Sequence, residues 1–168
     1  HGELTGNTVR KVRKLLAVVS ESVPFTPDLA KLKRLVEVRD DRTLKVYLSY
    51  LEDAGLIRQL TKGKHTLRQL AKPEKLYLDN TNQIYALSRD AHRQSGNLRE
   101  TFFASMLRSA GHELAVADRG DFLVNGKTTA EVGGAGKGFA QISNMPDSYL
   151  FVDDIELGAP NRIPLWVV

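Results

Sequence analysis

The stretch "GDFLVNGKTTAEVGGAGKGFAQI", residues 120–142, contains the residue types that a phosphate or metal centre would use. Asp121 opens one apolar run, Glu131 lies inside the next, and Lys137 follows in a glycine-rich segment. Carboxylate oxygens suit Mg²⁺, and a lysine can orient water or stabilise charge that develops on a phosphate. Glu100, on a preceding helical segment, could supply a third oxygen ligand. The pattern predicts a metal-dependent nuclease centre with Glu100, Asp121 and Glu131 as Mg²⁺ ligands and Lys137 at the phosphate.

A phosphate-binding loop is the first alternative for the same stretch. A Walker A loop needs a glycine, four residues, Gly-Lys, and then a serine or threonine whose hydroxyl meets magnesium. Here Gly138 follows Gly136-Lys137, and Glu131 occupies the position of the first glycine. The stretch therefore fails the motif at both ends.

Structural roles are the second alternative for these residues. Glu100 could be an exposed helix charge, Asp121 could cap a turn after Gly120, and Lys137 could be a surface charge. Glu131 is the hardest to explain in this way, because an unpaired carboxylate in an apolar strand costs on the order of several kcal/mol. A salt bridge would compensate that cost as well as a metal ion would.

The elements that must position these side chains form a small α/β module over residues 80–168. The segment "LRETFFASMLRSAG" is amphipathic and predicts a helix that carries Glu100 and is closed by Gly111. Asn125-Gly126 is a strong hairpin turn signal, and such a turn can bring Asp121 and Glu131 to one end or face of a sheet. Short helices are expected over 80–88 and near 139–144, and strands over 113–117, 122–124, 128–132, 149–152 and 165–168.

The first half of the chain predicts a winged-helix domain over residues 5–79. A helical stripe covers residues 8–20, and "VPFTP" ends that helix. Thr26 is expected to cap a second helix with Pro27 at its first position, and Asp40 or Asp41 to cap a third that stops at Gly55. Two strands, 56–60 and 75–78, then frame a basic, glycine-containing segment. Three helices followed by a hairpin is the plan of a winged helix.

Charge is distributed unevenly along the chain. Residues 1–75 hold 16 Lys and Arg against 9 Asp and Glu, whereas residues 76–168 hold 8 against 11. A basic first half favours binding to a polyanion such as DNA, while a solvated helical surface and an inter-domain or oligomer contact are the alternatives. The residues expected to contact DNA are Arg42, Lys45 and Ser49 on the third helix and Lys62, Lys64, His65 and Arg68 in the wing.

The composition excludes some kinds of site and some classes of protein. The chain has no cysteine, which excludes disulfides and cysteine-based zinc sites, and we expect a cytoplasmic protein. No apolar run approaches the ~20 residues of a membrane helix. Because the sequence begins with His-Gly rather than Met, we expect a processed tag or a fragment cut from a longer protein.

Four short strings carry a resemblance to a known fold. "GNLRETFF", "GDFLV", "TTAEV" and "FAQI" together resemble the PD-(D/E)xK nuclease-like fold. With the upstream "VPFTPDLAKL" and "TLKVYLSYLEDAGLI", residues 8–168 resemble the C-terminal region of a group of bacterial AAA-type ATPases, a winged helix followed by a nuclease-like domain of unknown function. The resemblance implies an ATP-binding parent protein, whose ATPase domain would be a partner in the same chain.

The resemblance also assigns roles to the candidate residues. Glu100 matches the helix glutamate, Asp121 the hairpin aspartate and Glu131 the strand glutamate of the fold. The pattern departs at Gly133, which stands where the fold has its lysine, and Lys137 would have to reach back from the next element.

Together these observations predict an α+β protein with an N-terminal winged helix-turn-helix and a restriction-endonuclease-like module. The implied function is DNA binding with a nuclease-like site that uses Mg²⁺ if it is active. The alternative is a non-catalytic regulatory or protein-interaction module of the same ATPase, and either function is compatible with an oligomer.

Overall fold

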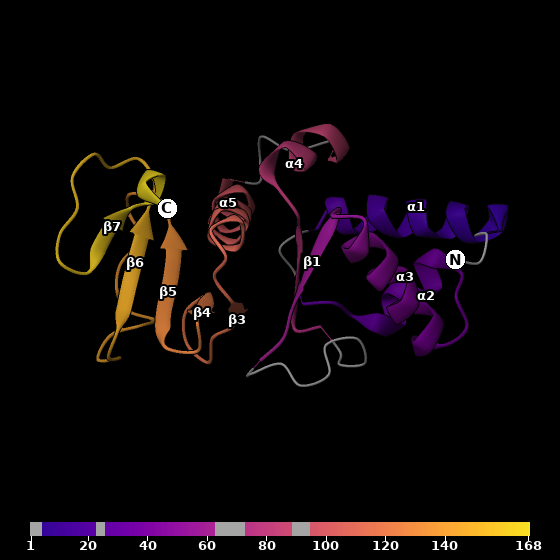
Figure 1. The fold of residues 1–168 in the computed structure, drawn as a ribbon, viewed down its shortest axis with the longest axis horizontal. Helices are drawn as coiled ribbons and strands as arrows, with labels where there is room; N and C mark the ends of the chain where they lie inside the picture. Colours follow the sequence, from indigo (N-terminus) through magenta and orange to yellow (C-terminus); the bar gives the residue numbers. More distant parts are fainter. Residues whose placement is uncertain (1–4, 23–25, 63–72, 89–94) are drawn as a thin grey trace.

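The computed structural model describes residues 5–22, 26–62, 73–88 and 95–168. These residues form five α-helices, a two-stranded hairpin and a five-stranded mixed sheet, which confirms the α+β class. In Figure 1 the helices α1–α3 lie on one side of the hairpin, and the sheet with helix α5 lies on the other. Among the described residues, no helix combines the length and apolarity needed to cross a bilayer.

Helices α1 (Gly6–Ser20), α2 (Leu29–Val36) and α3 (Asp41–Asp53) each begin at a polar cap. The predicted cap of α3 is confirmed, since Asp40 Oδ1 accepts a hydrogen bond from the Thr43 amide at 2.8 Å. The predicted cap of α2 is wrong. Asp28 rather than Thr26 accepts from the Lys31 amide, because its carboxylate lies three residues before that donor.

The hairpin contributes to two hydrophobic cores. Strands β1 (Ile57–Leu60) and β2 (Lys75–Leu78) pair antiparallel, and alternate residues face opposite sides. Leu76 and Leu78 pack with α1–α3 and α4 (Thr81–Leu87) in the first core. Leu60 and Tyr77 belong to the second core, with α5 (Ser95–Ser109) and the sheet. The hairpin is therefore buried on both faces and connects the two halves.

The sheet changes direction at its central strand. Its order is β3 (Leu114–Val116), β4 (Phe122–Val124), β5 (Thr128–Gly133), β6 (Ser148–Val152) and β7 (Arg162–Pro164). Strands β3, β4 and β5 are antiparallel, whereas β5, β6 and β7 are parallel. Asn125 and Gly126 join β4 to β5 with φ angles of 51° and 68°, as the predicted Asn-Gly turn requires.

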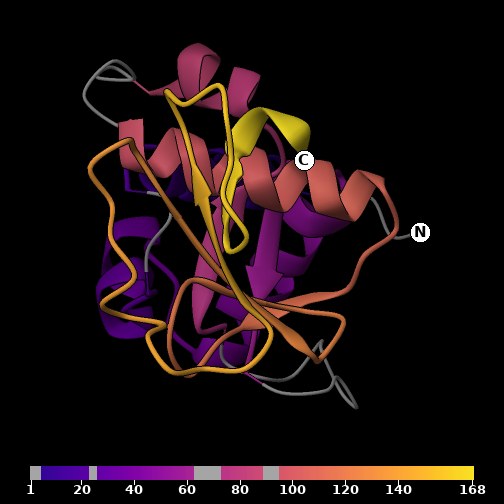
Figure 2. The ribbon, with the colours of Figure 1, turned by 90° about the vertical axis from the view of Figure 1, so that its left-hand side faces the viewer.

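Aromatic rings connect the sheet, α5 and the hairpin. Phe103 of α5 lies 5.1 Å from Phe122 and 4.7 Å from Phe151, measured between ring centroids. Tyr77 of the hairpin lies 5.5 Å from the same Phe122 ring. Figure 2 shows α5 crossing the strand direction. The elements that carry the candidate residues thus belong to one packed unit.

Two sequence expectations in the second half are wrong. The segment 139–144 forms turns instead of a helix, since it follows four glycines and ends at Asn144, whose φ is 62°. The expected strand over 165–168 is a 3₁₀ helix, Leu165–Val167, and β7 precedes it. The connection from β5 to β6 therefore contains no helix.

The double role of the hairpin leads to a stability prediction. Leu60→Ala should cost about 2–5 kcal/mol, because it leaves a cavity where the fully buried Leu60 contacts the second core. Chemical denaturation measures this cost, with Leu157→Ala as the control since Leu157 is 88% exposed. Equal effects of the two changes would contradict the proposed burial of this hairpin face.

Candidate active site

Ionisable side chains from the hairpin, α5, the sheet and the segment after β5 form two neighbouring sets of ion pairs. We call Glu100, Asp121, Glu131, Lys75 and Lys137 the acidic centre. Lys75 Nζ lies 3.3 Å from Glu100 Oε2 and 3.4 Å from Asp121 Oδ1. Lys137 forms an ion pair with Glu131 Oε1. Glu100 and Asp121 therefore share Lys75, which was not predicted, whereas Glu131 and Lys137 form a separate pair; the charges of Asp121 and Lys75 both affect the pKa of Glu131.

Glu100 is held on two sides by groups from the hairpin. Its Oε2 accepts a hydrogen bond from the Tyr77 hydroxyl at 3.0 Å, in addition to the contact with Lys75. Burial raises the pKa of Glu100, and the negative charge of Asp121 raises it further. Burial, followed by the charge of Glu100, also raises the pKa of the Tyr77 hydroxyl. Tyr77 thus remains a hydrogen-bond donor to Glu100.

Asp121 is fixed to the neighbouring strand β5 by two hydrogen bonds. Its backbone amide donates to the Ala130 carbonyl, and its Oδ2 accepts from the Val132 amide, both at 2.9 Å. These partners flank Glu131 in the chain. The turn at Asn125-Gly126 therefore brings Asp121 beside the backbone on either side of Glu131, close enough for the charge of Asp121 to raise the pKa of Glu131.

Glu131 is fully buried within β5. Its Oε1 pairs with Lys137, while its Oε2 receives no hydrogen bond from any described residue. Burial raises the pKa of Glu131 and the negative charge of Asp121 raises it further, and together they outweigh the lowering effects of Lys137 and Lys75. For Lys137, burial lowers the pKa, but the ion pair with Glu131 and the charges of Asp121 and Glu100 outweigh this and raise it.

Gly133 leaves the space through which the side chain of Lys137 reaches Glu131. A Cβ added at Gly133 would lie 2.6 Å from Cβ and Cγ of Lys137, closer than side-chain carbons approach each other. A side chain at position 133 and the present course of Lys137 therefore exclude one another. Lys137 runs over the position where the nuclease-like pattern has its lysine and reaches the strand glutamate from there.

The acidic centre does not fit a metal ion as it stands. Among the described residues, no group of three or more acidic or histidine side chains is arranged to hold one. Ammonium groups also lie against Glu100, Asp121 and Glu131. The Mg²⁺ that the resemblance implies would have to replace at least one of these cations.

Lys75 and Tyr77 also contact Glu100, although no motif in the sequence predicts this. Both lie on the hairpin, which was assigned to the first domain, and the only local signal is alternation in "KLYL". Leu76 and Leu78 face the helical core, so Lys75 and Tyr77 face away from it. Which groups they would meet depends on how the two halves pack.

The residues expected to contact DNA have different surroundings. Arg42 is exposed, Lys45 is half-buried, and the Ser49 hydroxyl donates to the Val46 carbonyl. Lys62 pairs with Asp118 of the second half at 3.4 Å. Lys64, His65 and Arg68 lie outside the described residues.

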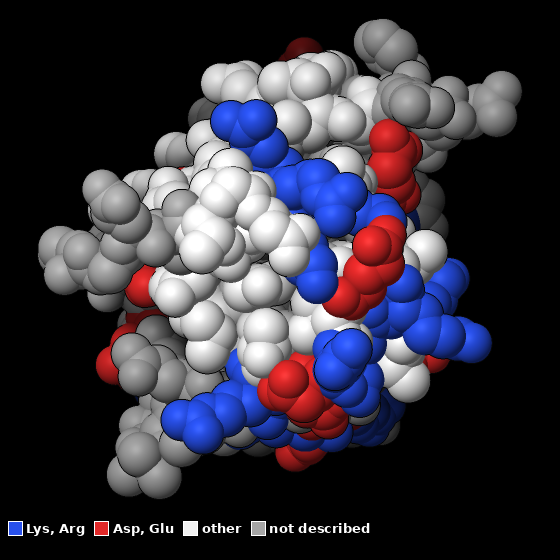
Figure 3. Space-filling view, turned by 90° about the vertical axis from the view of Figure 1, so that its right-hand side faces the viewer, with Lys and Arg blue, Asp and Glu red and all other residues white. Residues whose placement is uncertain are grey.

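Helix α1 adds basic residues that were not assigned to DNA. It carries Arg10, Lys11, Arg13 and Lys14 and no acidic residue. Glu37, at the end of α2, accepts from Lys14 through its carboxylate and from Lys11 through its carbonyl. Figure 3 views this side of the molecule and shows basic side chains interspersed with acidic ones around an uncharged area. The face is therefore of mixed charge, with a basic excess on α1.

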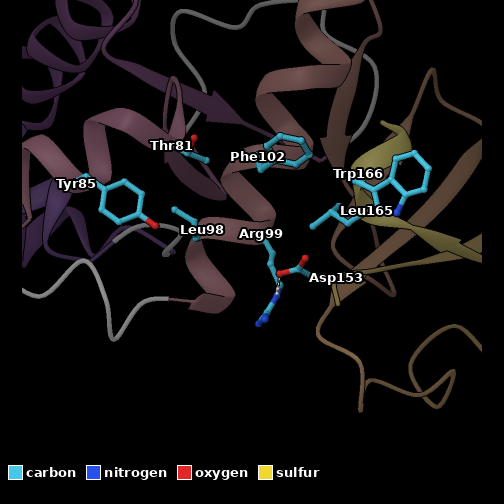
Figure 4. Close-up of a pocket in the computed structure, with 8 residues that line it drawn as sticks. All are labelled: Thr81, Tyr85, Leu98, Arg99, Phe102, Asp153, Leu165 and Trp166. Atoms are coloured by element: carbon cyan, nitrogen blue, oxygen red, sulfur yellow. Dashed lines mark hydrogen bonds and ion pairs between the residues drawn. The ribbon is translucent and has the colours of Figure 1, made fainter. Parts of the chain in front are cut away.

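A cavity of about 330 Å³ lies elsewhere, between α4, α5 and the C-terminal 3₁₀ helix. Figure 4 shows the Tyr85 and Trp166 rings on opposite sides of it, with Leu98 and Phe102 between them. Its polar lining includes Arg99, which donates to Asp153 at 2.9 Å. None of its lining residues belongs to the acidic centre, so the cavity is a separate feature.

Comparison with known proteins adds no assignment: no family model, curated protein or solved structure matches this chain.

The overlap at Gly133 leads to a double-mutant prediction. Gly133→Ala should destabilise the protein by about 1–3 kcal/mol, because the new methyl group would displace Lys137. In a Lys137→Gly background the same change should cost much less, since the competing side chain is absent. Denaturant unfolding of the four proteins measures the coupling. Equal costs in both backgrounds would show that Lys137 does not cover Gly133.

The raised pKa of Glu131 leads to a pH prediction. Its folded-state pKa lies above the usual 4.5, so the folded state binds the proton more tightly than the unfolded chain. As pH rises from about 4.5 through the folded pKa, the wild type should lose stability relative to Glu131→Gln. The free energy of unfolding of each protein is measured stepwise over this pH range, and the value for Glu131→Gln is subtracted from that of the wild type. Glu100 titrates in both proteins, so its contribution cancels to first order in this difference. A difference that is constant with pH, or of opposite slope, would contradict the raised pKa.

Proposed function

We propose that this chain is the C-terminal DNA-binding and nuclease-like region of a bacterial AAA-type ATPase, with its nuclease-like centre closed by internal lysines. In this proposal α1–α3 and the hairpin act as a winged helix, and α5 with the five-stranded sheet acts as a PD-(D/E)xK-like module. DNA is bound by the helical half. The ATPase domain of the parent protein is the partner within the same chain.

The observation that carries the proposal is the shared contact of Glu100 and Asp121 with Lys75, together with the buried Glu131 on the strand that pairs with β4. One comes from a helix, one precedes a strand and one lies inside a neighbouring strand, in the order that the nuclease-like pattern requires. Lys137 reaches Glu131 across Gly133 and supplies the cation of that pattern. An arrangement selected only for stability has no need of two carboxylates on one lysine and a third carboxylate buried in the next strand, since buried ion pairs are often no more stabilising than apolar packing.

DNA contact is supported by the charge of the helical half. The exposed Arg42 and the half-buried Lys45 lie on α3, and α1 adds four basic residues. Side chains of this kind neutralise backbone phosphates and release counterions, which gives a salt-sensitive and largely sequence-independent affinity. We assign these residues to phosphate contacts.

Protein interaction is the second candidate function, and one observation favours it. Leu35 of α2 and Val46 and Tyr50 of α3 are each more than a third exposed on the helical half. In a winged helix α3 would enter the DNA groove, but its exposed apolar side chains could equally well contact another protein. In that case the carboxylates and lysines of the acidic centre have a structural role only.

DNA binding is tested by titrating a fluorescent duplex with the protein over a range of salt concentrations. Arg42→Ala combined with Lys45→Ala should weaken binding about tenfold at low salt and reduce the salt slope by about 2, because two phosphate contacts are lost. Arg119→Ala with Lys127→Ala removes the same charges from the second half and serves as the matched control. Absence of binding at low salt would favour the protein-interaction function.

Cleavage is tested in the same samples with Mg²⁺ or Mn²⁺. A closed centre should leave the duplex intact in the wild-type protein. Metal-dependent cleavage by the wild type that is lost in Asp121→Ala would show an open, active nuclease and would contradict the closed state proposed above.

A further inference from the structure

The cavity between α4, α5 and the C-terminal 3₁₀ helix has the size and the walls of a ligand site. Its volume is about 330 Å³, within the range of about 300–1,000 Å³ that is common for such sites. Leu98, Phe102 and Leu165 contribute apolar surface, and the rings of Tyr85 and Trp166 flank them (Figure 4). These two aromatic residues are 52% and 67% exposed, so their apolar surface is accessible to a ligand.

The cavity also lies at the edge of the sheet where ligands of α/β proteins bind. Strands β5, β6 and β7 are parallel, so their carboxyl ends lie at the same edge. Asp153 directly follows β6, Leu165 directly follows β7, and both residues line the cavity. Open α/β sheets bind ligands in the crevice outside the carboxyl ends of their strands. The position of the cavity in the fold therefore agrees with a ligand site.

The polar groups at the cavity are held in place by the segment after β6. Arg99 Nε donates to Asp153 Oδ2 at 2.9 Å, and its guanidinium group also lies 3.4 Å from Asp154 Oδ2. The other oxygen of Asp153 accepts from the Asp154 amide at 3.0 Å. Trp166 Nε1 donates to the Ile155 carbonyl at 3.2 Å, which orients the indole ring. Groups that are fixed in this way lose little freedom when a ligand binds.

The charges at the cavity favour a cationic ligand. Of the described residues that line it, Arg99 and Asp153 carry charge, and Arg99 also pairs with Asp154. One guanidinium group thus faces two carboxylates, and the three groups together carry a net charge of −1. An anion would have to displace a carboxylate from Arg99, whereas a cation can use the remaining lone pairs of Asp153, whose side chain is 45% exposed. The faces of aromatic rings attract cations as well.

We propose that this cavity binds a small organic monocation with an apolar body, of the arylalkylammonium class. The ammonium group lies against the carboxylates of Asp153 and Asp154, and the apolar body lies between the rings of Tyr85 and Trp166. A ligand of this kind matches both the net negative charge of the polar side and the apolar lining of the rest of the cavity. The inference depends only on the cavity and is independent of the proposed function in DNA binding.

The test uses the fluorescence of Trp166, which is the one tryptophan of the chain and lines the cavity. The probe is 2-phenylethylamine, whose amine is protonated near pH 7 as that of lysine is. It should change the fluorescence in a saturable way, with a dissociation constant of about 1 mM or below. The neutral 2-phenylethanol and the anionic 3-phenylpropionate have the same ring and should bind at least about tenfold more weakly, because they lack the positive charge.

Substitutions of the carboxylates test where the ammonium group binds. Asp153→Asn should weaken binding of 2-phenylethylamine about tenfold and leave that of 2-phenylethanol unchanged, because only the charge is removed. Asp154→Asn should weaken it in the same direction, and it provides the measurement if Asp153→Asn does not fold, since the side chain of Asp154 is 70% exposed. Asp147→Asn is the matched control, because Asp147 is a half-exposed carboxylate that pairs with Lys127 instead. This control should bind the amine as the wild type does.

Three results would overturn the proposal. The first is the absence of a saturable fluorescence change with 2-phenylethylamine, and the second is binding of the alcohol or the carboxylate that is as tight as that of the amine. The third is wild-type affinity for the amine in the folded Asp153 and Asp154 variants. These results are separable from failure of the proposed function, because the titrations contain no nucleic acid. A protein that binds the amine but no duplex would keep the cation site and lose the DNA-binding assignment.

Discussion

The burial of both faces of one short hairpin is the constraint on which the rest of the structure depends. A two-stranded hairpin is at best marginally stable in water, so β1 and β2 require packing partners. Leu76 and Leu78 find them in the helical half, and Leu60 and Tyr77 find them against α5 and the sheet. Because strand side chains alternate, the second face also carries Lys75 into the sheet half.

This packing determines the electrostatics of the acidic centre. Glu100, Asp121 and Glu131 lie close enough to affect one another, and burial raises the pKa of Glu100 and of Glu131. Two lysines offset part of that cost, one from the glycine-rich segment after β5 and one from the hairpin. The packing of the hairpin therefore decides which lysine lies against Glu100 and Asp121.

Local patterns predicted most elements well. The Asn125-Gly126 turn, the strand 122–124 and the Asp40 cap follow from turn and capping chemistry that acts over a few residues. The wrong predictions lie where the local sequence is compatible with more than one cap or more than one secondary structure. Both Thr26 and Asp28 can cap a helix, and α2 uses Asp28. The apolar segment 165–168 suits a strand as well as a helix, and residues 165–167 form a 3₁₀ helix. Short apolar runs do not distinguish these states.

By itself the sequence determined the identity and order of the candidate residues: a helix glutamate, an aspartate and a glutamate on the two arms of a hairpin, and a lysine in the glycine-rich segment that follows. These depend on spacing within single elements or across one tight turn. Only the tertiary structure decided that Gly133 leaves room for Lys137 and that Lys75 enters the centre from the other half. The physical reason is that such contacts join residues far apart in the chain, and their distances are set by how two hydrophobic cores pack around a shared hairpin.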